Sequence, residues 1–346
     1  MNFRLLLLPF SVVYGIVVFV RNKLFDLGIL KENRFTVPVI GIGNITAGGT
    51  GKTPHAEYLV RLLSSDLNIA ALSRGYGRKT SGFLYVSENK TAEMVGDEPL
   101  QLKNKFKEIT VAVSEKRKDG IEKILIDNPN TSVVLLDDAF QHRAVKPGIS
   151  ILLLDYSTVF KTDFLLPAGN MREPFSAKKR ADIIVVSKCP QTIQEIERQK
   201  IIAKIAPDIN QKVFFSSEIY THEIKSVFSP QTLELSTYLN ILLVTGIADA
   251  KGIKAYLKTS TNLLKHLEFS DHHRFSNTDI KNIVEIFSTI ANENKIILTT
   301  EKDAMRLKEI LELREMPVYY LPIEIKFHKN DHDEFNKMIL RYVGKN

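Results

Sequence analysis

Short, unbroken apolar runs recur along the chain, and they constrain its fold more than any other feature. Seven runs are rich in valine, isoleucine and leucine and lack polar alternation: residues 37–43, 68–73, 109–113, 132–137, 149–155, 182–187 and 212–215. Strands that are buried on both faces have this composition, as in a parallel sheet covered by helices. Helix-like segments such as 55–63 and 115–125 lie between them. This alternation predicts an α/β fold with a doubly wound parallel sheet.

A second set of strand-like and helix-like segments follows a more polar stretch, residues 216–239. The strand-like segments are 241–247, 295–300 and 318–325, and the helix-like ones are 251–258 and 279–291. A second α/β unit is therefore expected after the first. We predict three parts: an N-terminal apolar helix (1–30), a core (31–215) and a smaller C-terminal α/β lobe with its linker (216–346).

The N-terminal segment 5–20, LLLLPFSVVYGIVVFV, is almost wholly apolar, and Arg4, Arg21 and Lys23 flank it. A membrane-spanning helix needs about 20 apolar residues, so this run is short. No small-residue cleavage site follows it, which argues against a secretory signal. Cations beside a long apolar face favour a helix that lies at an anionic membrane surface. A short insertion and a helix buried in the core are the alternatives.

Composition narrows the function less than the motifs do. The 346 residues carry a formal net charge of +7, which nucleic acid, anionic lipid or a phosphorylated substrate would each explain. Because no nucleic-acid-binding motif occurs, we expect no nucleic-acid partner, and the sequence singles out no protein partner. The lone cysteine, Cys189, cannot form an internal disulfide, which fits a reducing compartment.

A glycine-rich loop follows the first apolar run and precedes a helix-like segment. Residues 44–53 read NITAGGTGKT, which matches the phosphate-loop pattern G-x-x-x-x-G-K-[ST] except at its first position. Backbone amides of such a loop surround phosphate oxygens, the lysine reaches the β- and γ-phosphates, and the threonine hydroxyl ligates Mg²⁺. The sequence therefore predicts a nucleotide site made of Thr46, Ala47, Gly48, Gly49, Thr50, Gly51, Lys52 and Thr53.

Two carboxylates, Asp137 and Asp138, end the apolar run that begins at residue 132. Open α/β sheets bind ligands at the carboxyl ends of their strands. In phosphate-loop enzymes an aspartate at that place holds Mg²⁺ directly or through water. Asp137 and Asp138 both fit; we expect Asp138 to be a metal ligand, with Asp137 as the alternative. Gln141 and His142 follow at the same edge and are candidate substrate contacts. The alternative is a solvated turn.

Eight motifs, in this order, resemble those of one family, the tetraacyldisaccharide 4′-kinases of Gram-negative bacteria. They are GNITAGGTGKTP (43–54), SRGYGR (73–78), GDEP (96–99), DDAFQHR (137–143), LLPAGNMREP (165–174), VTGIA (244–248), FSDHHRF (269–275) and TTEKDA (299–304). The family's GGTGKTP-type loop accounts for Thr46 at the position where the general pattern has glycine. Ala139 departs from the glycine that is usual at its position in the family.

The resemblance implies a kinase that uses ATP and Mg²⁺ to phosphorylate the 4′-hydroxyl of a lipid A disaccharide 1-phosphate precursor. It implies a phosphate-loop core and a smaller C-terminal lobe joined by a β linker. The N-terminal segment is similar to the family's membrane-facing helix, which implies contact with inner-membrane lipids on the cytoplasmic face. The competing hypotheses are a phosphate-loop GTPase switch or metallochaperone, and a soluble ATP-dependent ligase.

The resemblance also suggests residue roles. Asp97 in GDEP is the expected base for the acceptor hydroxyl, and His272 is expected to pair with it; His273 is the alternative. This pairing requires the C-terminal lobe to close over the core, which would exclude water. Together with Lys52, Asp137 and Asp138, these residues form the expected catalytic set.

Basic residues in loops are candidates for phosphate capture. Arg74 and Arg78 flank a glycine-rich turn, and guanidinium groups on such a turn suit the substrate phosphate or the ATP phosphates. In the REP segment, we expect Arg172 to contact phosphate and Glu173 to ligate Mg²⁺. The alternative for each is an ordinary surface charge.

Overall fold

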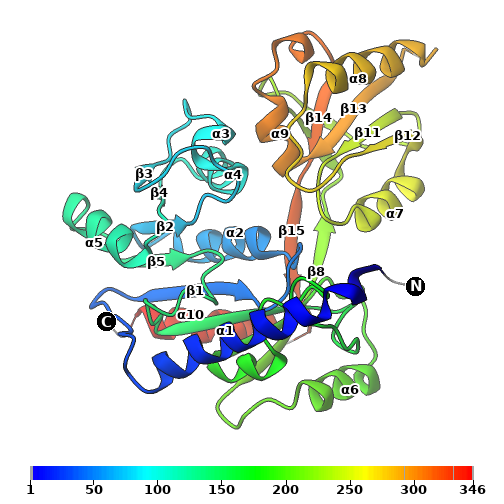
Figure 1. The fold of residues 1–346 in the computed structure, drawn as a ribbon. Coiled ribbons are helices and arrows are strands. Elements are labelled where there is room, and N and C mark those ends of the chain that lie inside the picture. The colour runs from blue at the N-terminus through cyan, green and yellow to red at the C-terminus, as the bar shows by residue number, and fades with distance from the viewer. Residues whose placement is uncertain (1–2, 292, 330, 345–346) are drawn as a thin grey trace.

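The computed structural model describes residues 3–291, 293–329 and 331–344, and within them the chain forms two sheets (Figure 1). The larger sheet has the strand order β15-β8-β7-β6-β1-β5-β2-β4-β3. Its strands are β1 (Val39–Asn44), β2 (Ile69–Ser73), β3 (Leu84–Tyr85), β4 (Thr110–Val113), β5 (Val133–Leu136), β6 (Ile149–Asp155), β7 (Ile183–Ser187), β8 (Lys212–Tyr220) and β15 (Ile323–Phe327).

The larger sheet is parallel from β4 through β8, and only its two edge strands, β3 and β15, run antiparallel to their neighbours. The seven apolar runs became these seven parallel strands, so the predicted α/β fold is confirmed. The chain builds one side of the sheet after β1 and then crosses to the other side at β6. Open sheets bind ligands at the carboxyl ends of strands beside such a crossing.

Helices cover both faces of the larger sheet. The helices packed on it are α2 (Lys52–Leu63), α4 (Asp97–Lys105), α5 (Arg117–Asp127), α6 (Glu195–Ile205) and α10 (Asp331–Val343). Leu59, Phe335 and Leu100 share a core with Ile151 and Val185, which places α2, α10 and α4 on one face. The alternate strand residues pack on the other side, against α5 and α6. Two short helices, α3 (Ala92–Val95) and the 3-10 turn η2 (Phe175–Arg180), lie in loops.

The smaller sheet has the order β10-β9-β14-β13-β11-β12. Its strands are β9 (Glu223–Ser226), β10 (Thr232–Glu234), β11 (Asn240–Thr245), β12 (Asn262–Glu268), β13 (Lys295–Thr300) and β14 (Val318–Leu321). Its helices are α7 (Lys251–Ser260), α8 (Asn277–Thr289), α9 (Glu301–Leu307) and the 3-10 turn η3 (Leu311–Leu313). Ser276 caps α8 through a reciprocal capping box with Asp279, which fixes where this helix begins.

The two sheets divide the chain differently from the ranges expected at the sequence level. β8 continues from the core through residue 220, and β15 returns from the smaller sheet to pair with it in antiparallel register. The rings of Phe327 and Phe335 stack at 4.4 Å, and both contact Phe214, so β15 and α10 bury their apolar faces in the larger unit. The β8–β15 ladder thus links the two sheets, as Figure 1 shows.

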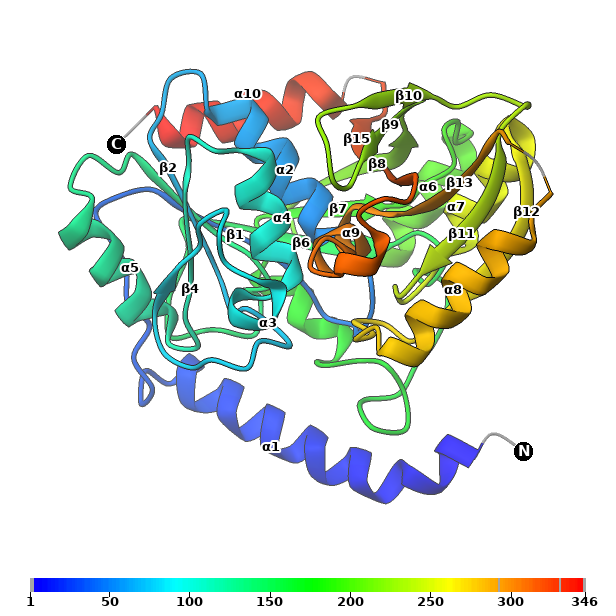
Figure 2. The same cartoon turned by 90° about the horizontal axis from the view of Figure 1, so that it is seen from above.

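The N-terminal helix α1 (Leu8–Asp26) follows a 3-10 turn, η1 (Phe3–Leu7), and lies along the outside of the larger unit (Figure 2). The segment Arg4–Asp26 is long and apolar enough to cross a membrane, yet only 11% of its most apolar window is buried. The exposed large side chains include Phe10, Ile16 and Phe19. This exposure contradicts the alternative of a helix buried in the core.

A buried cluster of charges joins the larger unit to the smaller one. The Lys105 ammonium on α4 lies 2.6 Å from Glu57 on α2 and 2.8 Å from Glu301 on α9. Gln101 donates a further hydrogen bond to Glu57 at 2.8 Å. Burial, and then the Glu301 charge, raise the pKa of Glu57 to about 7, although Lys105 opposes this shift. The ammonium therefore holds together two carboxylates that would otherwise repel.

Lys105→Met should destabilise the protein by about 3–5 kcal/mol, because it leaves two carboxylates in a buried site without their cation. The measurement is the free energy of unfolding in urea. Lys123→Met is the matched control, since Lys123 forms an exposed pair with Asp127, and such pairs contribute about 0–1 kcal/mol. Equal losses in the two variants would contradict a stabilising role for the buried cluster.

Candidate active site

The loop between β1 and α2 has the shape of a phosphate-binding loop. Gly48 and Gly51 adopt φ values of 111° and 82°, in the left-handed region that favours glycine. The Asn44 amide donates to the Thr50 hydroxyl at 2.9 Å, and Ser187 donates to the Thr50 carbonyl at 2.8 Å. These bonds fix the loop at the N-terminus of α2, where amide groups and the helix dipole favour an anion.

Two of the residues predicted to surround the phosphates, Thr46 and Ala47, lie outside the part of the loop that faces the N-terminus of α2. Thr46 forms a β-bridge with Met171, and the Ala47 amide donates to the Asn170 carbonyl at 2.6 Å. Because that amide points at a neighbouring segment, Ala47 braces the loop and does not fit the expected phosphate contact. The residues available to surround phosphate oxygens are therefore 48–53.

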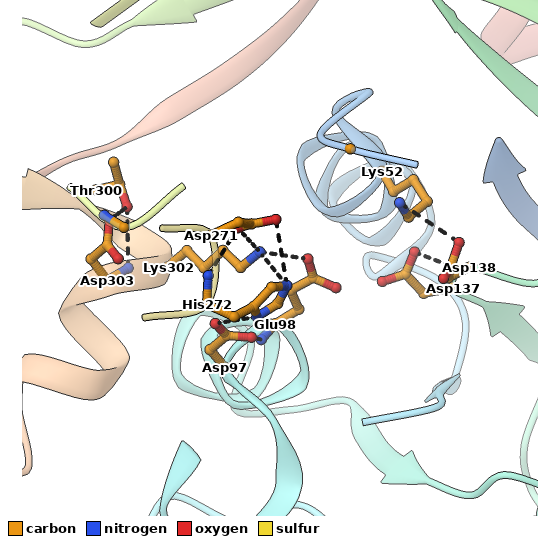
Figure 3. A network of polar contacts seen from close by, with 12 residues as sticks. Lys52, Asp97, Glu98, Asp137, Asp138, Asp271, His272, Thr300, Lys302 and Asp303 are labelled. Carbon is orange, nitrogen blue, oxygen red and sulfur yellow. Dashed lines mark hydrogen bonds and ion pairs between the residues drawn. The ribbon is translucent and has the colours of Figure 1, made fainter. Parts of the chain in front are cut away.

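Lys52 and Arg172 converge on Asp138, just beyond the end of β5. The Lys52 ammonium lies 3.6 Å from Asp138 Oδ1, and Arg172 Nη1 contacts the two carboxylate oxygens at 2.9 and 3.0 Å. Figure 3 shows the Lys52–Asp138 ion pair. Burial opposes ionisation, but the two cations keep the pKa of Asp138 below its ordinary value. The structure thus brings together three of the predicted site residues.

Asp137 lies in a different environment from Asp138. It lines one small cavity together with Thr53 and Glu98. Burial, followed by the charges of Glu98 and Asp138, raises the pKa of Asp137 to about 7, whereas Lys52 lowers it. A carboxylate whose ionised form is disfavoured in this way would be stabilised by a cation. Asp137 and the Thr53 hydroxyl therefore fit a metal better than the predicted Asp138, which already has two cationic partners.

The described residues contain no cluster of three or more His, Cys, Asp or Glu groups suited to holding a metal by themselves. Mg²⁺ in nucleotide enzymes takes one or two protein carboxylates and fills its remaining positions with phosphate oxygens and water. Thr53 and Asp137 provide a hydroxyl and a carboxylate of this kind beside the phosphate loop.

Asp97 and His272 lie within hydrogen-bonding distance of each other, although 175 positions separate them in the sequence. Asp97 begins α4 and is 5% exposed, and His272 follows β12. His272 Nδ1 lies 3.0 Å from Asp97 Oδ2, and its Nε2 lies 2.9 Å from the Lys302 ammonium (Figure 3). Since an ammonium only donates, Nε2 accepts, and in this arrangement Nδ1 carries the proton that His272 donates to Asp97.

Further cations surround this pair. Lys302 also lies 3.2 Å from Glu98, and Arg306 Nε lies 3.8 Å from Asp97. Burial opposes ionisation of Asp97, but the His272 hydrogen bond and the charges of Lys302 and Arg306 hold its pKa below the ordinary value. Asp97 is therefore an ionised carboxylate at neutral pH, with a side chain held in one position.

A buried aspartate fixes the loop that carries His272. Asp303, which is fully buried, accepts hydrogen bonds from the Gly246 amide at 3.0 Å and the Thr300 hydroxyl at 2.6 Å. The Gly246 carbonyl in turn accepts from the His272 amide at 3.1 Å. His273 instead contacts Asp279 at 3.0 Å, so only His272 of the two histidines meets Asp97.

The hydrogen-bonded group of Asp97, His272 and Lys302 lies between two cavities. The first is lined by residues 49–54 of the phosphate loop, by Glu98, and by smaller-lobe residues that include Asp271 and Lys302. The second is lined by Tyr76 and Gly77 of the glycine-rich turn together with Asp97 and His272. Asp97 therefore lines a cavity at the junction of the two lobes, and its neighbour Glu98 lines the cavity of the phosphate loop.

A group of basic side chains lies near Asp138. Arg117, at the start of α5, is 2% exposed, and its Nε and Nη2 atoms have no hydrogen-bond partner in the structure. Burial lowers the pKa of Arg117 to about 10, although Asp138 opposes this shift. Burial, and then the Arg117 charge, lower the pKa of His142 to about 4, and the exposed Arg74 acts in the same direction. The two guanidinium groups concentrate positive charge near Asp138, whereas His142, with its lowered pKa, is a neutral side chain at pH 7.

Three other predicted residues have structural partners. The Arg78 guanidinium is 2% exposed and is held by the Glu115 carboxylate and the Gly82 carbonyl, so it does not fit phosphate capture. The Glu173 side chain is 1% exposed and pairs with Arg180 at 2.6 Å, so it does not fit the expected metal ligand. Gln141 donates to the Asn44 carbonyl at 2.7 Å and thereby supports the phosphate loop.

Three residues of this site were not predicted from the sequence: Glu98, Arg117 and Lys302. Glu98 and Lys302 lie within two of the eight motifs: GDEP, in which only Asp97 was given a role, and TTEKDA, in which no residue was. Arg117 follows β4 closely, and a basic residue just beyond the carboxyl end of a buried strand is a signal that would have indicated it.

Comparison with known proteins agrees with this geometry. The family model described as Tetraacyldisaccharide-1-P 4′-kinase matches residues 3–343. The chain belongs to the tetraacyldisaccharide 4′-kinase family. A tetraacyldisaccharide 4′-kinase of Bacteroides thetaiotaomicron is 48% identical over an alignment of 354 positions, which covers 98% of this chain and 93% of the relative. A tetraacyldisaccharide 4′-kinase of Flavobacterium johnsoniae is 43% identical, and the match covers 99% of this chain and 98% of the relative.

The solved structures include a member of the same family. The crystal structure of LpxK from Aquifex aeolicus in complex with ATP superposes with a TM-score of 0.77 at 31% sequence identity. The match covers 98% of this chain and 99% of that one, so the similarity includes both lobes and the N-terminal helix. The family resemblance predicted from the eight motifs is confirmed.

Proposed function

We propose that the chain transfers the γ-phosphate of ATP to the 4′-hydroxyl of a tetraacyldisaccharide 1-phosphate, with Asp97 as the base. One observation carries this assignment of roles: an ionised, buried carboxylate lines the cavity next to that of the phosphate loop and is oriented by His272, which Lys302 contacts in turn. Phosphoryl transfer requires positioning and charge neutralisation more than covalent chemistry, and the site supplies both.

The nucleotide occupies the cavity between the lobes. Its phosphates lie against residues 48–53, with Lys52 on the β- and γ-phosphates, where a phosphate oxygen replaces Asp138 as the partner of the ammonium. The apolar side chains of Ile253, Leu321 and Ile323 line the same cavity and provide a surface for the flat base. Residues from both lobes line it, so nucleotide binding favours the closed arrangement of the two units.

Thr53 and Asp137 would hold Mg²⁺, which would neutralise charge on the phosphates of the nucleotide when bound. The assignment of these two residues is supported by the cavity that they share and by the raised pKa of Asp137. Arg172 stays beside Asp138 and adds a bidentate guanidinium for the transferred group.

Metal affinity should depend on pH through Asp137. Because its pKa is raised to about 7, a cation must displace a proton below that pH, so affinity falls by about tenfold for each pH unit below 7 and is constant above it. Mn²⁺ binding to the protein saturated with a nonhydrolysable ATP analogue, followed by electron paramagnetic resonance, measures this slope. In Asp137→Asn the slope should disappear; an unchanged slope would assign the titration to another group.

The acceptor occupies the second cavity, with its 4′-hydroxyl at Asp97. His272 donates its Nδ1 proton to one carboxylate oxygen, which leaves the other oxygen to accept the hydroxyl proton as the phosphate is transferred. Arg74, Arg117 and His142 bind the anionic phosphate of the acceptor. The unpartnered nitrogen atoms of Arg117 support this contact, since a buried guanidinium without partners is stabilised by an anion.

The enzyme works on the cytoplasmic face of the inner membrane. The exposed apolar residues of α1 and the cations Arg21 and Lys23 support an orientation in which this helix contacts the bilayer. The acceptor is a lipid, so a site close to the membrane surface shortens its path to Asp97.

A label-transfer assay tests the function. With γ-labelled ATP and the disaccharide 1-phosphate acceptor in mixed micelles, the product should carry label at the 4′-position, and omission of the acceptor should abolish transfer. GTP turnover without a phosphorylated acceptor would favour the switch or metallochaperone hypothesis. Transfer that does not depend on detergent or lipid would favour the soluble-ligase hypothesis.

A further inference from the structure

The loop between β6 and η2 is bound tightly to the N-terminal helix. The Ser11 hydroxyl on α1 donates to the Leu165 carbonyl at 2.9 Å and accepts from the Ala168 amide at 2.9 Å. The Arg4 guanidinium donates to the Gly169 carbonyl at 2.6 Å. Residues 163–170 and the first half of α1 therefore form one unit, although about 150 positions separate them.

The two segments also pack closely. A Cβ atom at Gly15 of α1 would lie 2.9 Å from the Leu165 Cδ1 atom, so glycine at this position allows the loop to lie directly against the helix. The Tyr14 hydroxyl donates to the Arg172 carbonyl at 2.9 Å and extends the contact by one helical turn. The loop is thus part of the surface that α1 presents.

This loop exposes large apolar side chains of its own. Phe160 is 52% exposed and Phe164 is 50% exposed, values similar to the 65% of Phe10 on α1. Lys161, between the two phenylalanines, is also exposed. Contiguous apolar surface rimmed by cations marks an interaction site, and aromatic rings beside lysine are typical of the membrane interface.

We propose that the loop of residues 156–171 is a second membrane-contacting element, which enters the interfacial layer of an anionic bilayer beside α1. The inference rests on the proposed membrane location of α1 and adds a part of the chain that is remote in sequence. A bilayer is the occupant because α1 and the loop bonded to it both expose large apolar side chains, the exposed Lys23 and Lys161 lie beside these side chains in the sequence, and the acceptor is a lipid.

The loop connects the bilayer to the phosphate site. Beyond Phe164 the chain passes Asn170, whose carbonyl holds the Ala47 amide at 2.6 Å, and Arg172, whose amide donates to the Ile45 carbonyl at 2.7 Å. Arg172 then contacts Asp138. Insertion of the loop would therefore fix the height and tilt of the phosphate loop above the membrane. Two contacts with the bilayer, α1 and the loop, define this orientation better than α1 alone.

The chain contains no tryptophan, so single tryptophan substitutions report local insertion. We expect Phe164→Trp and Phe10→Trp to shift their emission to shorter wavelength on vesicles of phosphatidylethanolamine and phosphatidylglycerol, and brominated lipids to quench both. Tyr238→Trp is the control, because Tyr238 is 81% exposed and lies between β10 and β11 of the smaller sheet. Its emission should not change.

The three tryptophan variants test the membrane contact of the loop separately from that of α1. A shift for Phe10→Trp without a shift for Phe164→Trp would overturn the loop inference and leave the membrane location of α1 intact. No shift for either would overturn both. A shift in the Tyr238→Trp control equal to that of Phe164→Trp would also overturn the inference, because the contact would then not be specific to the loop.

A loss-of-contact variant gives an independent measurement. Phe160→Ser with Phe164→Ser should raise the dissociation constant for the same vesicles by about tenfold or more, because two half-exposed phenyl groups no longer reach the apolar layer. Its affinity for ATP should not change. Ile126→Ser on α5 is the matched control, since Ile126 is 76% exposed on a helix outside this surface. Vesicle binding that is unchanged in the double variant would overturn the inference.

Discussion

Asp97→Asn should lower kcat for transfer to the lipid acceptor by about 10²–10⁴, the range expected when a general base is removed. The asparagine amide keeps the shape of the side chain but does not accept the hydroxyl proton. Affinity for ATP should change little, because Asp97 lines the second cavity and the phosphate loop lines the first. Rapid-quench measurement of label transfer, with ATP affinity measured separately by calorimetry, checks both expectations.

A second histidine–carboxylate pair provides a matched control. His273 and Asp279 lie 3.0 Å apart, the same distance as His272 and Asp97, but Asp279 belongs to the capping box of α8 and neither residue lines either cavity described above. Asp279→Asn should therefore leave kcat close to that of the unaltered enzyme. Asp97→Asn with normal turnover would refute the base assignment, and equal losses in the two variants would show that the loss comes from local unfolding.

Lys52→Ala should lower kcat by about 10²–10³, because it removes a preorganised cation from the phosphates on which charge develops. The fold should survive, since Arg172 still pairs with Asp138 after the lysine is removed. The urea midpoint of unfolding provides that control. The measurement is label transfer from ATP to the disaccharide acceptor, and a variant that folds normally and turns over at the unaltered rate would refute the nucleotide site.

These two variants also distinguish the nucleotide site from the acceptor site. Lys52→Ala acts on the nucleotide and should weaken ATP binding as well as transfer, whereas Asp97→Asn acts on the acceptor and should impair transfer alone. An enzyme in which both changes weakened ATP binding equally would place Asp97 in the nucleotide site.

The larger sheet was predictable because its strands are buried on both faces. Such strands are continuous apolar runs, and the strand that precedes the phosphate loop could be recognised from residues 37–43 alone. The strand β12 was not predicted, since its residues are mostly exposed or half-buried and include Lys265 and His266. Helix α4 has a polar sequence, DEPLQLKNK, and its apolar face becomes evident only through contacts with other elements.

The site was predictable where a motif fixes several neighbours at once. The phosphate loop, Asp137 and Asp138 could be located because each follows a buried strand directly. The contacts of Lys302 with His272 and of Arg78 with Glu115 depend on how distant loops approach each other, 30 and 37 positions apart. Periodicity carries no information about such approaches, so Arg78 was expected at the phosphates and Glu173 at Mg²⁺, although their partners lie elsewhere.

The return of β15 and α10 to the larger sheet has a consequence for biosynthesis. A ribosome makes β8 more than 100 residues before β15, so β8 is an unpaired sheet edge while the whole smaller lobe is translated. The cavity between the lobes has β15 residue Ile323 in its wall, so it is completed only at this late stage. Contacts between segments so far apart form slowly. The nascent chain therefore exposes its apolar N-terminal helix, the proposed membrane contact, well before it has a finished nucleotide site.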